Sequence, residues 1–317
     1  MRCRFRPRIL TSVLLCVATA GLFLGSMGNF PVPLSLRSLW GSRLCSCSKC
    51  LPERNPCFTE MIQEAPHPFL TKEHAISAAD FKWWKPIQGE KRNFTFYNAT
   101  VEKVFEMFPR FPTLLGPHPD RCRSCAVVGN SGNLKGSRYG PLIDQHNIVI
   151  RINRARTAGY EQDVGTKTTH HIMYPESRTQ LDNSTYLLFF PFKTTDFLWL
   201  MDHYRPEENG AEKPKRIANK DLVFILSPAF MKYVHEAWLR RVGSYPSTGF
   251  MALALSTYFC DEVHVFGFGA DRDGNWDHYF EKLQNKNLKT GGHPGSYEYT
   301  MIEKLHKKNI IQFFKGM

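Results

Sequence analysis

Short runs rich in β-branched and aromatic residues alternate with helical patterns through most of the chain after residue 120. This alternation is typical of an α/β fold with a parallel sheet. One helix is expected to follow Ser227 and to end near Gly243, and a second to follow Ser247 or Thr248 and to continue to Phe259. Strands are expected over residues 126–128, 148–152, 171–174, 186–190, 222–226 and 263–268. With 42% apolar residues in 317, the chain can bury the core of one large domain of about 250 residues.

The first 27 residues combine a basic flank with an uncharged segment. Residues 1–8 contain four arginines, and residues 9–27 contain no charged side chain. As a helix, about 19 residues cover most of the roughly 30 Å of a bilayer's hydrocarbon core. The positive-inside rule then keeps the arginines in the cytoplasm and exports the rest. A cleaved signal peptide ending near Ala18 and Ala20 is the alternative, but the apolar segment continues past Ala20, which favours an anchor.

The remaining chain divides by composition into a tether and a domain. Prolines, glycines, serines and a cysteine cluster are concentrated in residues 28–60, which is typical of a stem. We therefore expect a cytoplasmic tail over 1–8, a signal-anchor transmembrane helix over 9–27, a stem over 28–60 and a lumenal domain over 61–317.

The formal net charge of +12 raises nucleic-acid binding as one function class. However, the four arginines of residues 1–8 supply a third of that charge, and they belong to the predicted anchor. Glycosylation sequons begin at Asn93, Asn98 and Asn183, which suits an exported chain. We therefore expect no nucleic-acid partner.

Seven cysteines follow the predicted anchor segment, at positions 45, 47, 50, 57, 122, 125 and 260. The groups at 45–50 and 122–125 have spacings that a zinc ribbon also uses. In an oxidising compartment disulfides are the favoured interpretation. Because seven is odd, at least one thiol stays free or pairs between chains.

A glycine-rich turn follows the expected strand 126–128. Gly129 and Gly132 flank Asn130 and Ser131. Such a turn lets backbone amides approach a phosphate, although its spacing matches neither a dinucleotide fingerprint nor a P-loop. An ordinary turn between a strand and a helix is the equally weighted alternative.

Two further patterns carry candidate chemistry. Asp271 and Asp273 form a carboxylate pair that suits a divalent cation, but the Gly and Asn that follow at once favour a turn. His278 and His293 each lie near a carboxylate, and histidine is the natural general base near neutral pH. Spacing alone does not distinguish catalytic from structural histidines.

Four motifs in order resemble those of the sialyltransferases, glycosyltransferase family 29. Residues 122–177 are similar to the long sialylmotif, and residues 245–271 to the short one. Residues 278–281 resemble the third motif, and His293 with Glu298 resembles the very short motif. Within the family, residues 191–194 and 314–316 are similar to the β-galactoside α2,3 branch.

The resemblance implies a fold and a reaction. The fold is a single Rossmann-like domain, a variant GT-A nucleotide-sugar transferase fold with a mostly parallel seven-stranded sheet, preceded by one transmembrane helix. The reaction transfers N-acetylneuraminic acid from CMP-N-acetylneuraminate to the galactose 3-hydroxyl of Galβ1-3GalNAc on O-glycans and glycolipids. It is an inverting single displacement that needs no metal or other cofactor.

The resemblance also implies residue roles. His293 is the general base, and His278 assists the departing CMP phosphate. The donor-binding positions are Asn130, Asn153, Gly249, Gly269 and His278. The acceptor-binding positions are Gln88 and Tyr245, with Tyr204 a candidate from the segment 202–215. The implied disulfides are Cys45–Cys50, Cys47–Cys122 and Cys125–Cys260.

The same resemblance implies a single-pass type II protein of the Golgi membrane, with secretion after stem cleavage as a further route. Cys57 has no implied partner and is a candidate for linking two chains as a homodimer. The alternatives are a sialyltransferase of another linkage or acceptor, and an inactive lumenal carbohydrate-binding protein. Intact His278, His293 and Glu298 argue against the inactive protein.

Overall fold

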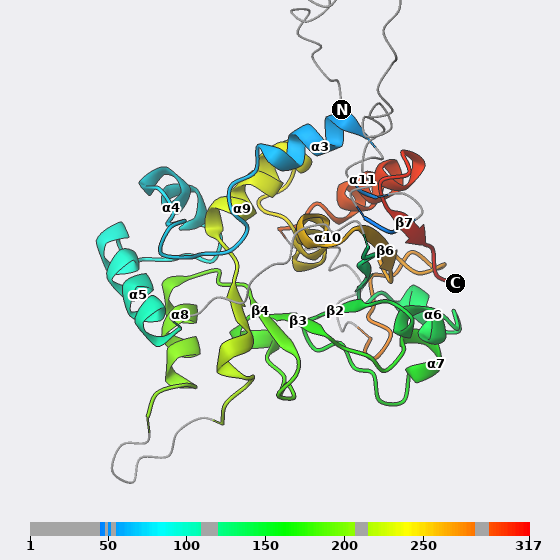
Figure 1. Cartoon of the computed structure of the whole chain (residues 1–317), viewed down its shortest axis with the longest axis horizontal. Helices are drawn as coiled ribbons and strands as arrows, with labels where there is room; N and C mark the ends of the chain where they lie inside the picture. The colour runs from blue at the N-terminus through cyan, green and yellow to red at the C-terminus, as the bar shows by residue number, and fades with distance from the viewer. Residues whose placement is uncertain (1–44, 48–49, 52–54, 109–119, 207–214, 283–291) are drawn as a thin grey trace, which may run out of the picture. The chain divides into compact units, whose positions relative to one another are not determined.

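The computed structural model describes residues 45–47, 50–51, 55–108, 120–206, 215–282 and 292–317, drawn in colour in Figure 1. One compact unit spans Leu44–Met317. The predicted tail and anchor, residues 1–27, lie outside the described residues. Among the helices that the structure describes, none has both the length and the apolar character needed to cross a bilayer.

A seven-stranded sheet forms the centre of the domain, and all of its strand pairs are parallel. The strands are β1 (Ser124–Val128), β2 (Ile148–Ile152), β3 (His170–Met173), β4 (Tyr186–Phe189), β5 (Val223–Ile225), β6 (Glu262–Phe266) and β7 (Gln312–Phe314). The expected α/β class and strand number are confirmed, and the sheet is wholly rather than mostly parallel. Six strands coincide with the predicted ranges to within two residues at each end, and β7 was not predicted.

The strand order reverses between the fifth and sixth strands of the sheet. The order is β5-β4-β3-β2-β1-β6-β7, so the chain adds strands to one side of β1 and then crosses to the other. On β1, Cys125 is level with Ile148 of β2 and with Val263 of β6. Open α/β sheets bind ligands at the carboxyl ends of the strands where the order reverses in this way. This reversal lies between β1 and β6.

Helices cover both faces of the sheet. The α-helices are α3 (Pro56–Gln63), α4 (Ala78–Trp84), α5 (Phe94–Met107), α6 (Gly140–Asp144), α7 (Glu161–Val164), α8 (Thr194–Asp202), α9 (Pro228–Tyr233), α10 (Thr248–Phe259) and α11 (Gly295–Lys307). Short 3₁₀ turns cover Gly132–Leu134, Pro175–Ser177 and Lys220–Leu222. In Figure 1, α4, α5 and α8 gather at the left of the domain and α6 and α7 at the right.

Alternate residues of the strands supply two separate cores. Cys125 and Val127 of β1 pack in the larger core, which also holds the whole length of α10. Ala126 and Val128 face a smaller core on the other side of the sheet. Because α10 contacts β1, β2 and β6, its apolar character on most sides follows from burial.

The helix after Ser227 is shorter than predicted. Its α-helical part ends at Tyr233 and continues as a π-helix over Val234–Trp238, five residues before Gly243. Arg240 and Arg241 then adopt left-handed φ angles of 52° and 63°. Side chains with a Cβ rarely adopt this conformation, so the sequence carried no signal for the early end.

Three disulfides cross-link the domain: two fasten the chain that precedes the sheet, and the third joins β1 to the C-cap of α10. They join Cys45 to Cys50, Cys47 to Cys122 and Cys125 to Cys260, the pairs that the resemblance implies. Because all six sulfurs are bonded to one another, the zinc-ribbon alternative does not apply to them. The side chain of Cys57 lies outside the described residues.

Candidate active site

A cavity of about 480 Å³ opens at the carboxyl ends of β1, β2 and β6, at the reversal of strand order. Its walls come from the turns after these strands, the beginning of α10, residues 276–278 and the first part of α11. Six residues with predicted roles line it together: Asn130, Asn153, Gly249, Gly269, His278 and His293. The fold thus brings together residues from positions 130 to 293.

The glycine-rich turn after β1 is pressed against the turn after β6. A Cβ on Gly129 would lie 2.2 Å from the carbonyl oxygen of Gly267, so a larger residue has no room. The backbone N–H of Ser131 donates to the same oxygen at 3.1 Å. The predicted turn therefore forms part of the cavity wall, and a short 3₁₀ turn rather than an α-helix follows it.

Asn130 and Asn153 bring amide groups to the floor of the cavity. Asn130 Nδ2 donates to the carbonyl of Ile152 at 2.9 Å, which fixes the orientation of that side chain. The Oδ1 atoms of Asn130 and Asn153 are buried and have no hydrogen-bond partner among the described residues. Since buried polar atoms are nearly always paired in folded proteins, these oxygens are suited to accept hydrogen bonds from a ligand.

Two glycines allow close packing around the beginning of α10. A Cβ on Gly249 would lie 2.9 Å from the Phe268 ring, and one on Gly269 would lie 2.5 Å from the Tyr299 ring. Gly269 also has a φ of 92°, which residues with a Cβ rarely adopt. The N-terminus of α10 is therefore open to the cavity, and the unpaired N–H groups of a helix N-terminus favour a negatively charged ligand.

His278 is oriented by an acidic neighbour. Its Nδ1 lies 2.7 Å from Oε1 of Glu281. A carboxylate only accepts hydrogen bonds, so Nδ1 carries the hydrogen and Nε2 is the nitrogen left for a ligand. The residue also forms an isolated bridge with Ser131, which holds the segment against the glycine-rich turn.

His293 lies where this cavity meets a second one. Its Nδ1 is 3.4 Å from the carbonyl oxygen of Tyr245, and the two rings meet edge to face at 4.5 Å. If Nδ1–H donates to that carbonyl, Nε2 carries the lone pair that a general base needs. Burial lowers the pKa of His293, against the raising effect of the Tyr245 carbonyl, so the neutral ring is favoured.

The second cavity has a volume of about 260 Å³ and shares Tyr174, Thr248 and His293 with the first. Both predicted acceptor residues line it, and Gln88 Nε2 donates to the Tyr245 hydroxyl at 3.0 Å. The two cavities therefore form one continuous cleft with His293 at the junction.

Asp271 and Asp273 form a turn, as their sequence context indicates. Oδ1 of Asp271 accepts the backbone N–H of Asp273 at 3.0 Å and that of Asn275 at 2.8 Å. Oδ2 of Asp271 accepts from the Asn275 amide at 3.2 Å. Both oxygens of Asp271 are thus engaged within the loop itself.

Tyr204, a candidate acceptor contact, lies outside the cleft, and Glu176 and Lys193 were not predicted from the sequence as cleft residues. Tyr204 is buried, its hydroxyl donates to the carbonyl of Ala218, and it lines neither cavity. Its assignment as an acceptor contact is therefore wrong. Glu176 and Lys193, which line the second cavity, follow β3 and β4. Their position just after parallel strands is the signal that would have identified them.

The predicted sequons lie on the surface. Asn93, Asn98 and Asn183 are all exposed, and Asn93 also caps α5 by accepting the N–H of Phe96.

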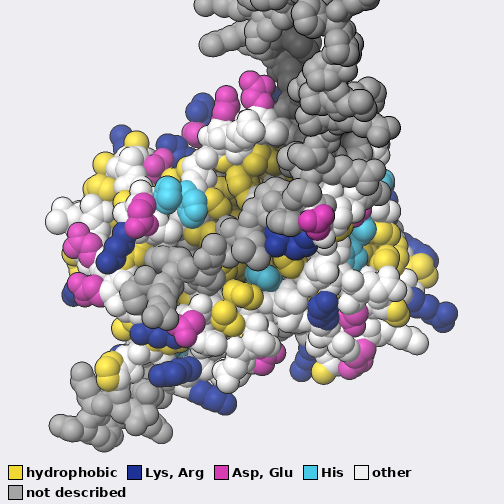
Figure 2. Space-filling view, viewed as in Figure 1, with side chains coloured by type: hydrophobic (Ala, Val, Ile, Leu, Met, Phe, Trp, Pro, Cys, Tyr) yellow, Lys and Arg dark blue, Asp and Glu magenta, His cyan; other side chains and the backbone are white. Residues whose placement is uncertain are grey.

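On the described part of the face in Figure 2, Lys and Arg side chains are interspersed with Asp and Glu.

The comparisons with known proteins place the chain in one family. The model for glycosyltransferase family 29 (sialyltransferase) matches residues 69–310. CMP-N-acetylneuraminate-beta-galactosamide-alpha-2,3-sialyltransferase 1 of Sus scrofa is 42% identical over 284 residues, covering 86% of this chain and 82% of that protein. The corresponding enzyme 2 of Mus musculus is 37% identical over 288 residues, covering 86% and 81%.

Solved structures give the same result for the fold. A crystal structure of a mammalian sialyltransferase matches with a TM-score of 0.75 and 41% identity, covering 86% of this chain and 99% of that one. A mammalian sialyltransferase in complex with Gal-beta-1-3GalNAc-ortho-nitrophenol matches with a TM-score of 0.73 and 40% identity, covering 86% and 100%. The chain belongs to glycosyltransferase family 29, the sialyltransferases.

Proposed function

We propose that the chain transfers N-acetylneuraminic acid from CMP-N-acetylneuraminate to the 3-hydroxyl of galactose in Galβ1-3GalNAc, forming an α2,3 linkage. The observation that carries the proposal is the position of His293, which lines both cavities of the cleft. Two ligands bound in these cavities would meet at its imidazole. The printed names of the α2,3-sialyltransferase relatives and the disaccharide in one matching complex support the choice of substrates.

In this proposal the donor occupies the larger cavity. The unpaired oxygens of Asn130 and Asn153 accept hydrogen bonds from the nucleotide, and Gly249 and Gly269 let the backbone approach it. The N-terminus of α10 and Nε2–H of His278 stabilise charge on the CMP phosphate. In this proposal these groups act without a metal, because fixed dipoles and the ring N–H of His278 supply the charge stabilisation.

The acceptor occupies the smaller cavity, where Gln88 and Tyr245 contact the galactose. Nε2 of His293 removes the proton of the 3-hydroxyl as that oxygen forms a bond to the anomeric carbon of the sialic acid. The bond from that carbon to the phosphate oxygen breaks in the same step, and CMP leaves with the bonding electrons. Attack from the side opposite to CMP inverts the anomeric configuration.

The same proposal includes the topology. Residues 1–8 form a cytoplasmic tail, 9–27 an anchor and 28–60 a stem of a Golgi type II protein, with the catalytic domain in the lumen. The exposed sequons at Asn93, Asn98 and Asn183 suit that compartment.

An acceptor panel with linkage analysis tests the function. The full chain, in detergent, is given CMP-N-acetylneuraminate with Galβ1-3GalNAc, Galβ1-4GlcNAc or lactose, and the products are analysed by linkage-specific sialidases and NMR. We expect α2,3-linked product and a preference for Galβ1-3GalNAc. An α2,6 linkage, or no transfer to Galβ1-3GalNAc, would overturn the proposal.

A further inference from the structure

The smaller cavity has a second wall that the predicted acceptor residues do not cover. Gln88, Tyr245 and His293 form one contiguous side of it, through the Gln88–Tyr245 hydrogen bond and the Tyr245–His293 ring contact. Glu176 follows β3 and Lys193 follows β4, and these two residues contribute a carboxylate and an ammonium group to its lining. Neither residue lines the larger cavity.

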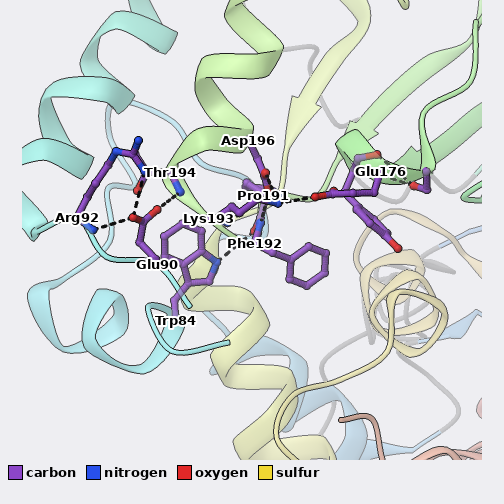
Figure 3. A network of polar contacts seen from close by, with 11 residues as sticks. Trp84, Glu90, Arg92, Glu176, Pro191, Phe192, Lys193, Thr194 and Asp196 are labelled. Atoms are coloured by element: carbon purple, nitrogen blue, oxygen red, sulfur yellow. Dashed lines mark hydrogen bonds and ion pairs between the residues drawn. The ribbon is translucent and has the colours of Figure 1, made fainter. Parts of the chain in front are cut away.

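Lys193 is held in place by two carboxylates (Figure 3). Its Nζ lies 2.7 Å from Oε1 of Glu176 and 2.8 Å from Oδ1 of Asp196. Asp196 is almost completely buried, and its Oδ2 also accepts the backbone N–H groups of Phe192, at 2.8 Å, and Lys193, at 3.2 Å. Partial burial opposes the charge on Lys193, but the hydrogen bonds to both carboxylates dominate and raise its pKa. The side chain is therefore a fixed cation.

The ammonium group of Lys193 retains a hydrogen-bond donor. A lysine ammonium has three N–H groups, and among the described residues Nζ is bonded to Glu176 and Asp196 alone. The residue lines the cavity with a side chain that is 29% exposed. One N–H is thus available to a ligand bound in this cavity.

The segment that carries Lys193 is fastened to the segment that carries Gln88. Trp84 Nε1 donates to the carbonyl of Pro191 at 3.1 Å. The buried carboxylate of Glu90 accepts the N–H of Thr194, the first residue of α8, and the N–H of Arg92 at 2.8 Å (Figure 3). The two walls therefore keep a fixed separation, as a site that measures the size of a ligand requires.

We propose that Lys193 is a specificity-determining residue that donates a hydrogen bond to an oxygen of the sugar next to galactose in the acceptor. The inference rests on the proposed function. The galactose must bring its 3-hydroxyl to His293, so it occupies the side formed by Tyr245 and Gln88. The adjoining sugar then extends along the remaining lining, where Lys193 offers its N–H.

The test compares two acceptors of different length on the full chain. Lys193→Met removes the charge and the donors while keeping the aliphatic length. With CMP-N-acetylneuraminate saturating, we expect KM for Galβ1-3GalNAc to rise by about tenfold or more, the usual effect of losing a hydrogen bond to a charged group. KM for methyl β-galactoside and KM for the donor should not change. Lys103→Met, on the exposed side of α5, is the matched control.

Each outcome separates this inference from the proposed function. Equal losses on both acceptors, or no loss on the disaccharide, would overturn the role of Lys193. If the wild-type chain makes no α2,3-linked product from either acceptor, the proposed function itself fails. Lys193→Arg, which keeps a cation between the two carboxylates, should give a KM for the disaccharide between those of wild type and Lys193→Met. An Arg variant that folds, by its thermal unfolding curve, and matches Lys193→Met on both acceptors would also contradict the inference.

Discussion

Glu298 on α11 accepts two hydrogen bonds from Ser247, one from the backbone N–H at 2.7 Å and one from the hydroxyl at 2.6 Å. Ser247 is the N-cap of α10, so this contact joins the beginnings of two helices that line the larger cavity. Burial raises the pKa of Glu298 to about 7, although both hydrogen bonds from Ser247 lower it. The contact is therefore sensitive to protonation in the neutral range.

The contribution of Glu298 to the stability of the protein is expected to fall as pH rises through this range. The folded pKa of Glu298 lies above its ordinary value of 4.5, so its contribution is complete below pH 4.5 and is lost as pH approaches 7. Glu298→Gln should remove this dependence, which amounts to about 3 kcal/mol at most. Denaturant unfolding of both proteins at pH 5 and pH 7.5 measures it. If the free energies of unfolding of wild type and Glu298→Gln differ by the same amount at pH 5 and at pH 7.5, the raised pKa of Glu298 would be contradicted.

His293→Ala should reduce kcat by at least about 10²-fold, the lower end of the usual contribution of a positioned base. CMP binding should be largely retained, because the donor contacts lie elsewhere in the cleft. Since the pKa of His293 in the free protein is below its ordinary value of 6.5, the acidic limb of wild-type kcat/KM should also lie below that pH. Single-turnover rates measure the loss of catalysis, and CMP titration calorimetry measures nucleotide binding. Turnover close to wild type would rule out His293 as the base.

Glu281→Gln should lower kcat on the order of tenfold and leave the acceptor KM nearly unchanged. The Glu281 carboxylate fixes Nδ1 of His278 as a donor, and a neutral amide holds that ring less strongly. Initial-rate kinetics with each substrate varied separately give the required values. Glu102→Gln, on an exposed position of α5, is the matched control, and equal effects of the two substitutions would argue against an orienting role.

Chelation should leave the rate unchanged. Both oxygens of Asp271 are engaged by the backbone and amide of its own loop, which leaves the Asp271–Asp273 pair poorly arranged for a divalent cation. The measurement is the initial rate with and without EDTA, after the enzyme has been treated with the chelator. Strong inhibition that Mn²⁺ or Mg²⁺ reverses would restore these carboxylates as metal ligands.

Local sequence signals were sufficient for the sheet but less so for its edges. The segment 148–152 coincides with β2, and four of its five residues are Ile or Val, as expected for a strand of a parallel sheet that is covered on both faces. β7 has only three residues, Gln312–Phe314, too few for a periodicity to be recognised. The helix after Ser227 was predicted to end near Gly243, but it ends earlier. The π-helix and the left-handed arginines that end it leave no mark in the composition.

In the site, too, the sequence motifs indicated some residues, and only the fold revealed others. His278 and His293 were identified through their motifs, whereas spacing alone left both as ordinary histidines. The fastening of Glu90 to Thr194 could not be predicted, since it joins positions 104 residues apart through a contact that exists only after α8 packs. The position of Lys193 after β4 marked it as a possible cleft residue, but its two ion pairs with Glu176 and Asp196 could be recognised only in the fold.

The parallel pairing of β1 with β6 also sets when during synthesis the enzyme can become active. Ser124 of β1 is level with Glu262 of β6, so β1 cannot complete its pairing until the chain has been synthesised past residue 266. The disulfide from Cys125 to Cys260 spans the same interval of 135 residues. Pairings this distant form slowly. A nascent chain without β6 lacks one wall of the larger cavity, so we expect incomplete products released during translation to be inactive.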